Sequence, residues 1–148
     1  MIRREAKDRG GYILILRLDR GGSIPVGKLG RISFEKGYYL YVGSARRGLS
    51  GRIGRHLKKR KTFFWHIDYL RNEADKVIAL PIRSSFKDEC DLAGDLDEIA
   101  EGSIPGFGAS DCTCESHLFR MTESPLRSPR FIDLLLDYRI RRLDKILS

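Results

Sequence analysis

Residues 37–57, GYYLYVGSARRGLSGRIGRHL, constrain the fold more than any other stretch of the chain. The aromatic and β-branched run 38–42 predicts a strand, which Gly43 and Ser44 are expected to end. A basic turn follows, and the apolar periodicity after it predicts a helix over 49–59. A buried strand therefore leads directly into a cationic helix. Such a junction favours bound phosphate, because free backbone N–H groups and fixed cations meet there.

The bulk composition is that of one globular domain. The chain has 148 residues, of which 41% are hydrophobic and 32% charged. No apolar run approaches the roughly 20 residues of a membrane-spanning helix, and the charged N-terminus lacks the apolar region of a secretory signal. We therefore expect a cytoplasmic protein with no membrane association. Three cysteines, an odd number, argue against a disulfide framework.

Positive charge is concentrated in the first part of the chain. Residues 1–61 contain 17 Lys and Arg against 4 Asp and Glu, whereas residues 62–148 contain 11 against 16. Within 44–61 there are 8 basic residues and no acidic ones. This asymmetry predicts a nucleic-acid partner, although a solvated helix face with a basic turn would give the same pattern. The candidate contact residues are Ser44, Arg46, Arg47, Arg55, Lys58, Lys59, Arg60 and Lys61.

The remaining patterns predict an α+β fold. Its core is a small, mixed, mainly antiparallel three-stranded sheet flanked by helices, followed by an extra C-terminal helix. Strands 12–18 and 38–42 should pair antiparallel, and Pro81 indicates that strand 76–82 lies at an edge. The other expected segments are one or two short extended pieces within 24–34, a helix over 63–71 capped by Thr62, a helix over 89–100, a loop over 101–117, and a terminal helix opened by Ser128-Pro129.

Two polar residues of the 49–59 helix border its apolar face. At about 100° per residue, Arg52 and His56 fall beside the apolar stripe, while Arg55, Lys58 and Lys59 point away from it. An inward arginine needs an anionic partner, which a bound phosphate would provide. The alternative is an Arg52 paired with a structural carboxylate and a half-buried, satisfied His56.

One carboxylate and two tyrosines complete the candidate chemistry. Glu89 shares the apolar face of its helix with Leu92 and Leu96, and a single inward carboxylate suits Mg²⁺, which keeps most of its waters. Alternatively, Glu89 only satisfies the helix dipole. Tyr12 and Tyr41 lie where paired strands would bring both hydroxyls near the start of the basic helix, although each alone reads as an ordinary strand aromatic.

A cysteine-containing segment offers a different metal. Cys112, Cys114 and His117 could place three zinc ligands, with Cys90 or His66 as a fourth. The spacing is irregular for zinc, and a loop held by side-chain hydrogen bonds explains the segment as well. We therefore do not expect zinc as the cofactor.

Taken in order, these residues resemble the GIY-YIG nuclease superfamily. The resemblance is carried by Gly10-Gly11-Tyr12, then Tyr41-Val42-Gly43, then Arg52 and His56, and then Glu89. The segments YVGSA, RIGRHL, WHIDYL and FGASDC are similar to its Uri-type, endonuclease-III-associated branch, long labelled a domain of unknown function. The resemblance implies a nuclease domain over 10–119, between a flexible N-terminus at 1–9 and a C-terminal helical extension at 120–148. The 28 residues between the two tyrosine motifs imply an inserted hairpin.

The resemblance also implies a reaction and a role for each site residue. Tyr12 is the general base or its partner, Tyr41 orients water or phosphate, and Arg52 stabilises the transition state. His56 shuttles a proton or binds phosphate, and Glu89 anchors one Mg²⁺ or Mn²⁺ ion. The implied activity is metal-dependent hydrolysis of DNA phosphodiester bonds in structured or damaged DNA, with a role in repair. The alternatives are a non-catalytic nucleic-acid-binding module on the same fold and a zinc-stabilised adaptor.

Overall fold

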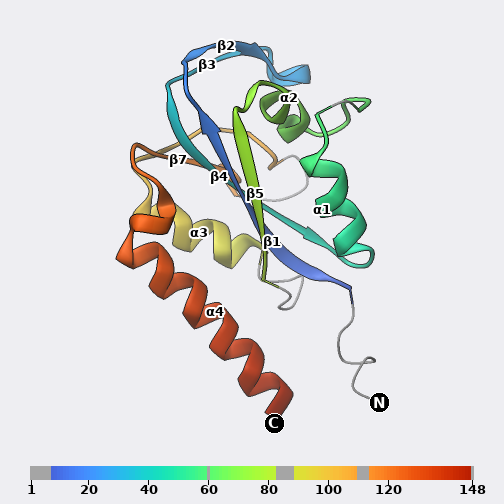
Figure 1. Ribbon diagram of the computed structural model, residues 1–148, viewed down its shortest axis with the longest axis vertical. Coiled ribbons are helices and arrows are strands. Elements are labelled where there is room, and N and C mark those ends of the chain that lie inside the picture. The colour runs from blue at the N-terminus through green and yellow to red at the C-terminus, as the bar shows by residue number, and fades with distance from the viewer. Residues whose placement is uncertain (1–7, 60, 83–88, 110–113, 148) are drawn as a thin grey trace.

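A five-stranded antiparallel sheet is the scaffold of the molecule. The computed structural model describes residues 8–59, 61–82, 89–109 and 114–147. In spatial order the strands are β5 (Lys76–Pro81), β1 (Gly10–Leu18), β4 (Gly37–Ala45), β7 (Leu118–Met121) and β6 (Gly102–Ser103). Helices cover both faces of this sheet (Figure 1), so the architecture is α+β with three layers.

The pairing of β1 with β4 confirms the predicted antiparallel arrangement. Nine residue pairs run from Gly10–Ala45 to Leu18–Gly37, and the register places Tyr12 opposite Gly43. Within the described ranges strand β5 pairs with β1 alone and lies at the sheet edge, as Pro81 predicted.

Two parts of the strand prediction are wrong. The sheet has five strands instead of three, and every described ladder is antiparallel instead of mixed. The additional strands β6 and β7 are two and four residues long, and β6 falls in the segment predicted to be a loop. They are too short for a periodic signal, and only their pairing with β4 and with each other defines them. Strand β4 also continues through Gly43 and Ser44, because their partners on β1 extend the ladder.

The predicted extended pieces form a separate hairpin. Strand β2 (Gly22–Pro25) pairs with β3 (Arg31–Phe34), and the 3₁₀ turn η2 (Gly27–Leu29) joins them. Ile24 and Phe34 bury their side chains in the main core, so the hairpin packs against the domain.

The helices begin close to the predicted positions. They are α1 (Leu49–Leu57), α2 (His66–Glu73), α3 (Glu89–Ile99) and α4 (Pro129–Leu147), and the 3₁₀ turn η4 (Pro125–Arg127) precedes α4. Ser128 caps α4 through its hydroxyl, which accepts the N–H of Phe131. The helix predicted over 63–71 instead starts at His66, and Asp68 rather than Thr62 binds its N-terminal amides.

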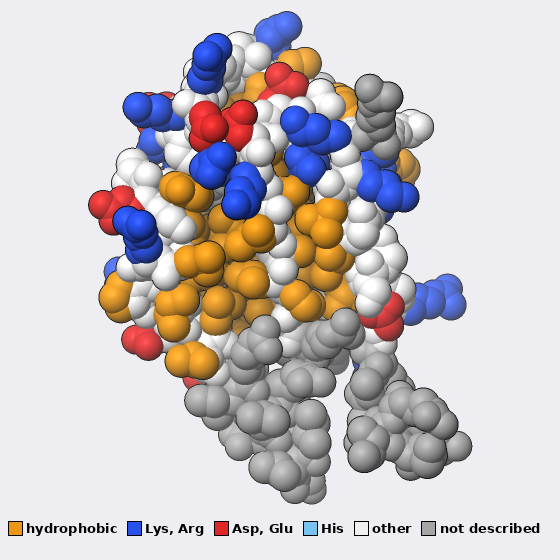
Figure 2. Space-filling model, in the orientation of Figure 1, with side chains coloured by type: hydrophobic (Ala, Val, Ile, Leu, Met, Phe, Trp, Pro, Cys, Tyr) orange, Lys and Arg blue, Asp and Glu red, His pale blue; other side chains and the backbone are white. Residues whose placement is uncertain are grey.

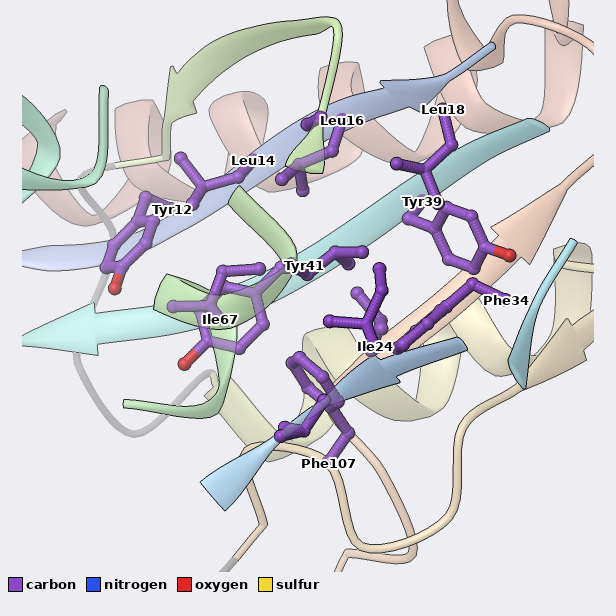
Figure 3. Close-up of a cluster of buried hydrophobic side chains, with 14 of the residues drawn as sticks. Tyr12, Leu14, Leu16, Leu18, Ile24, Phe34, Tyr39, Tyr41, Ile67 and Phe107 are labelled. Carbon is purple, nitrogen blue, oxygen red and sulfur yellow. The ribbon is translucent and has the colours of Figure 1, made fainter. Parts of the chain in front are cut away.

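Alternating residues of β1 and β4 divide the core into two clusters. Tyr12, Leu14, Tyr39 and Tyr41 face α1, α2 and the hairpin, and Figure 3 shows these side chains around Ile67, Phe34 and Phe107. The intervening residues of the same strands face α3 and α4, where Leu92, Leu96, Phe131 and Tyr138 are buried.

On the side that carries β5, hydrophobic side chains gather over the middle of the molecule (Figure 2). Ile78 and Leu80 of β5 are partly buried there, in the same cluster as Leu134 and Leu135 of α4. In the part of the chain that the structure describes, no helix is both long and apolar enough to cross a membrane.

A buried carboxylate fastens α1 to α2. Asp68 is fully buried and accepts two hydrogen bonds from the Arg55 guanidinium at 2.9 and 3.0 Å, and Lys61 lies 3.6 Å away. It also accepts the N–H groups of Phe64 and Trp65 at 2.7 and 2.9 Å. Burial raises the pKa of Asp68, but these donors together bring that pKa below its usual value. The carboxylate is therefore charged and fully paired.

Removal of this carboxylate should destabilise the domain strongly. Asp68→Ala removes the carboxylate that accepts from the buried side of Arg55 and from two backbone amides, so we expect the free energy of unfolding to fall by about 3–5 kcal/mol. Urea denaturation followed by far-UV circular dichroism measures this loss. Asp97→Ala, at an exposed position of α3, is the matched control and should change stability by less than about 0.5 kcal/mol. Equal effects of the two variants would contradict the assigned role.

Candidate functional site

A cleft of about 520 Å³ opens where β1 and β4 meet the helices α1 and α3. Strand residues, helix residues and loop residues all contribute to its wall. The lining residues are Tyr12, Tyr41, Gly43, Ser44, Arg46, Arg47, Arg52, Trp65, Glu89, Gly108 and His117. Four of the five residues predicted to be catalytic, Tyr12, Tyr41, Arg52 and Glu89, thus lie in one cleft, and the fifth, His56, lies directly behind Tyr12.

Tyr12 reaches across β4 to helix α1. Its hydroxyl lies 2.7 Å from Nε2 of His56, and its ring packs over Gly43 on the neighbouring strand. A Cβ atom at position 43 would overlap the Tyr12 hydroxyl, so only glycine fits there. The missing side chain of Gly43 is therefore what allows Tyr12 to bond to His56.

Tyr41 stands beside Tyr12 on the same face of the sheet. The two ring centroids are 6.5 Å apart, and Figure 3 shows both rings on neighbouring strands. Burial raises the pKa of both hydroxyls well above the usual value; the nearby Glu89 carboxylate raises both further, while Arg52 lowers both. Both tyrosines are therefore protonated at neutral pH in the protein alone.

His56 is a neutral ring at physiological pH. Only 1% of its surface is exposed, and burial lowers its pKa to about 4, with the Lys61 ammonium acting in the same direction. Its Nδ1 is buried without a hydrogen-bond partner. Because the ring is uncharged, Nε2 can either donate to the Tyr12 oxygen or accept its proton.

Arg52 is held between the strand end and an aromatic ring. Its guanidinium donates to the Ser44 carbonyl at 2.5 Å and stacks 5.1 Å from the centre of the Trp65 ring. The predicted alternative, pairing of Arg52 with a structural carboxylate, has no counterpart among the ion pairs described for the protein. The guanidinium therefore brings a net positive charge to the cleft.

Among the described residues that line the cleft, Glu89 supplies the only carboxylate. It is the first residue of α3, and 28% of its side chain is exposed. Its Oε1 lies 3.9 Å from Nδ1 of the buried His117. Burial lowers the pKa of His117, although Glu89 and a hydrogen bond with the Val42 backbone oppose that shift. The His117 imidazole is therefore uncharged at neutral pH, and the Glu89 carboxylate lies near it without forming an ion pair.

The predicted nucleic-acid contacts fall into two groups. Ser44, Arg46 and Arg47 line the cleft, and Lys58 and Lys59 are exposed at the end of α1. By contrast, Arg55 and Lys61 are engaged inside the chain. Arg55 bonds to Asp68 and stacks 4.6 Å from the centre of Trp65, and Lys61 donates to the carbonyls of Arg55 and His56. Arg60 lies outside the described residues.

The N-terminus of α1 already has an anionic partner. The Asp8 carboxylate accepts the N–H and the hydroxyl of Ser50 at 2.7 to 3.0 Å, and the Asp8 carbonyl accepts the N–H of Leu49. The free amides that the strand–helix junction was expected to offer to phosphate are therefore occupied in part by the protein itself. The cations of the junction, rather than its amides, face the cleft.

The predicted zinc set is rearranged. Cys112 lies outside the described residues, whereas Cys90, Cys114 and His117 form a group whose potential ligand atoms lie within 4.8 Å of one another. His66, the other suggested ligand, accepts the N–H of Gly108 through Nδ1 at 2.8 Å and is not in this group.

Three contributors to the cleft were not identified as such from sequence patterns. Trp65 reads as a core residue of a helix, but it precedes α2 and stacks on both Arg52 and Arg55. His117 appeared only as a zinc ligand, yet it faces Glu89. Gly108 has φ +68°, and a side chain there would contact Tyr41, so this loop must approach the tyrosine closely.

Fold and site together define an α+β domain with a basic cleft whose described lining includes two tyrosines, three arginines and one carboxylate. A family model described as "Domain of unknown function DUF123" matches residues 11–137, and the chain belongs to that family. The match continues past residue 119, where the resemblance placed the end of the domain, into helix α4. No curated protein and no solved structure matches the chain.

Gly43→Ala should displace Tyr12 and loosen its bond to His56. Overpacking at this position is expected to lower the free energy of unfolding by about 1–3 kcal/mol. Gly11→Ala is the matched control, since a Cβ there meets only the Gly43 carbonyl oxygen at an ordinary 3.7 Å. Chemical denaturation of both variants tests this, and the packing assignment is wrong if Gly43→Ala is as stable as Gly11→Ala.

The His56 ring should titrate near pH 4 instead of near its ordinary pKa of 6.5. Between these values the unfolded chain binds a proton that folded His56 does not, so stability falls as the pH drops from about 6.5 towards 4. NMR titration of the imidazole Cε1–H resonances measures the midpoint, and a His56→Gln variant assigns the signal. A midpoint near 6.5 would show that the ring is not buried as described.

Proposed function

We propose that this protein is a metal-dependent endonuclease that hydrolyses DNA phosphodiester bonds. The observation that carries the proposal is the convergence of Tyr12, Tyr41, Arg52 and Glu89 on one cleft, from β1, β4, α1 and α3. Binding of phosphate alone requires neither a carboxylate nor two buried tyrosines. The ordered motifs on the same residues support placing the DUF123 family within the GIY-YIG superfamily.

The donor set of the cleft suits one Mg²⁺ or Mn²⁺ ion. Glu89 is partly exposed, and its negative charge raises the pKa of both tyrosines, so a cation beside it would lower the pKa of both hydroxyls. A single carboxylate is typical of magnesium sites that complete their shell with water and substrate phosphate. When bound, the ion supplies charge neutralisation and polarises water or phosphate oxygen.

Arg52 binds the phosphate at which cleavage occurs. Its guanidinium is fixed by the Ser44 carbonyl and the Trp65 ring, so little conformational entropy is lost when it meets a second partner. A planar guanidinium also matches two phosphate oxygens, and its charge stabilises the additional negative charge of the transition state.

Tyr12 and His56 together move the proton of the attacking water. Tyr12 accepts a proton from water as it passes its own to Nε2 of His56, 2.7 Å away. In the protein alone both groups are neutral, and the low pKa of His56 opposes the transfer. An anionic phosphate at Arg52 raises the pKa of His56 and so favours the transfer only when substrate is present.

Arg46 and Arg47 extend the contact along the DNA backbone. Both line the cleft beside Arg52, and Lys58 and Lys59 present further positive charge at the end of α1. Arginine contacts to phosphates position a nucleic acid without reading its sequence. A substrate recognised by its structure, such as branched or damaged DNA in repair, fits such contacts.

Purified protein with Mg²⁺ or Mn²⁺ should cleave at least one of a panel of branched, flap, single-stranded and damaged DNA substrates. Glu89→Ala and Arg52→Ala should each reduce the single-turnover rate by roughly 100-fold or more, because each removes charge stabilisation of the transition state. Tyr12→Phe should also reduce this rate while preserving DNA binding. Gel-based cleavage and fluorescence anisotropy measure rate and binding separately.

Two matched variants control for general damage to the protein. Asp97→Ala removes an exposed carboxylate from α3, the helix of Glu89, and Arg130→Ala removes an exposed arginine from α4. Both should keep the wild-type rate. Cleavage unaffected by Glu89→Ala would refute the metal site. Salt-sensitive binding without cleavage of any substrate would favour the non-catalytic binding module.

A further inference from the structure

A second group of potential metal ligands lies beside the cleft. Cys90 is on the first turn of α3, and Cys114 and His117 lie on the segment that leads into β7. One potential ligand atom from each residue lies within 4.8 Å of the other two. Tertiary packing thus brings Cys90 of α3 close to Cys114 and His117.

The chemistry of this group differs from that of the cleft. Among the described residues it combines two thiols with one imidazole and no carboxylate, whereas the cleft offers Glu89. Sulfur and imidazole nitrogen are the ligands of structural zinc, and thiolates do not suit Mg²⁺. Donor atoms around tetrahedral zinc lie roughly 3.5 to 3.8 Å apart, so a contraction of about 1 Å would complete the geometry.

The segment that carries two of the ligands is held rigidly. The His117 N–H donates to the Phe107 carbonyl at 2.8 Å, and the Ser116 hydroxyl both donates to the Leu118 carbonyl and accepts the Leu118 N–H. The His117 ring is buried and forms a hydrogen bond with the Val42 backbone. Zinc-bound histidines typically have such an outer partner, which fixes the ring orientation.

The exposure of the ligands provides a route for the ion. His117 is buried, Cys114 is intermediate and Cys90 is exposed, and neither of these two cysteines is in a disulfide. An ion can therefore enter from the Cys90 side without unfolding of the core. Because Cys90 directly follows Glu89, an ion here would also fix the start of α3 next to the cleft.

We propose that Cys90, Cys114 and His117 bind one Zn²⁺ ion that fastens the start of α3 to the segment before β7. A fourth coordination position is filled by water or another donor. The zinc is distinct from the divalent cation proposed at Glu89, and its role is to hold Glu89 and His117 in the wall of the cleft. Of the ligands weighed from the sequence, this set keeps Cys114, His117 and Cys90 and leaves out His66, while Cys112 lies outside the described residues.

The test uses the full chain, purified under reducing conditions, stripped with a chelator and reconstituted with Zn²⁺ alone. We expect about one tightly bound zinc ion per chain by elemental mass spectrometry. Co²⁺ in place of zinc should give intense thiolate-to-metal absorption and the visible bands of tetrahedral coordination. Chelation should lower the melting temperature of the wild type.

Substitutions identify the ligands. Cys90→Ser, Cys114→Ser and His117→Ala should each lose most of the bound zinc and the chelator-induced change in melting temperature. Cys90 is exposed, so Cys90→Ser remains a fair test even if His117→Ala does not fold. Asp91→Ala, the exposed neighbour on α3, and His66→Gln, a histidine outside the group, should bind zinc like the wild type.

The failure of this proposal is separable from failure of the nuclease proposal, because zinc is measured without DNA. Glu89→Ala should keep its zinc while losing cleavage. Absence of bound zinc in the reduced protein would overturn the proposal, as would retention of zinc by Cys90→Ser. Formation of a disulfide between Cys90 and Cys114 in reducing buffer, with no metal uptake, would also overturn it.

Discussion

The absence of a side chain at Gly43 determines how the cleft is built. Register along the β1–β4 ladder places Tyr12 opposite this glycine, and the tyrosine ring fills the space that a Cβ would occupy. From there its hydroxyl reaches His56 on α1. One residue of register slip would turn Tyr12 to the other face of the sheet and end that contact. The register of strand pairing therefore positions the residues of the site, in addition to the stability that the sheet gives the fold.

The charged side chains of this region form two sets: one holds α1 and α2 together, and the other lines the cleft. In the interior, Asp68 accepts hydrogen bonds from Arg55 and lies 3.6 Å from the ammonium of Lys61, so ionic contacts hold α1 and α2 together. Arg52 lies one turn before His56 on the same helix. Its guanidinium bonds to the Ser44 carbonyl and places its positive charge in the cleft. The Trp65 ring stacks on Arg52 and on Arg55, so it contacts one arginine of each set.

Much of the fold follows from local sequence patterns. The long apolar run of β1, the aromatic run of β4 and the periodic helices α1, α3 and α4 have strong signals, and each was found within a few residues. The short strands β6 and β7 have none, because their stability comes from backbone pairing with distant residues. The same is true of Asp68, whose role as cap and ion-pair partner depends on the path of the chain between α1 and α2.

The sequence by itself determined the residue types of the site and their periodic placement on strands and helices. Side-chain direction within one helix indicated Arg52, His56 and Glu89, because it follows from fixed helix geometry. Tyr12 and Tyr41 were indicated by the expected pairing of their strands and by the resemblance. Only the tertiary structure decided that Trp65 and His117 join the cleft, that Arg55 and Lys61 turn inward to Asp68, and that Cys90 meets Cys114. These outcomes depend on how separate elements pack, and local periodicity carries no information about that.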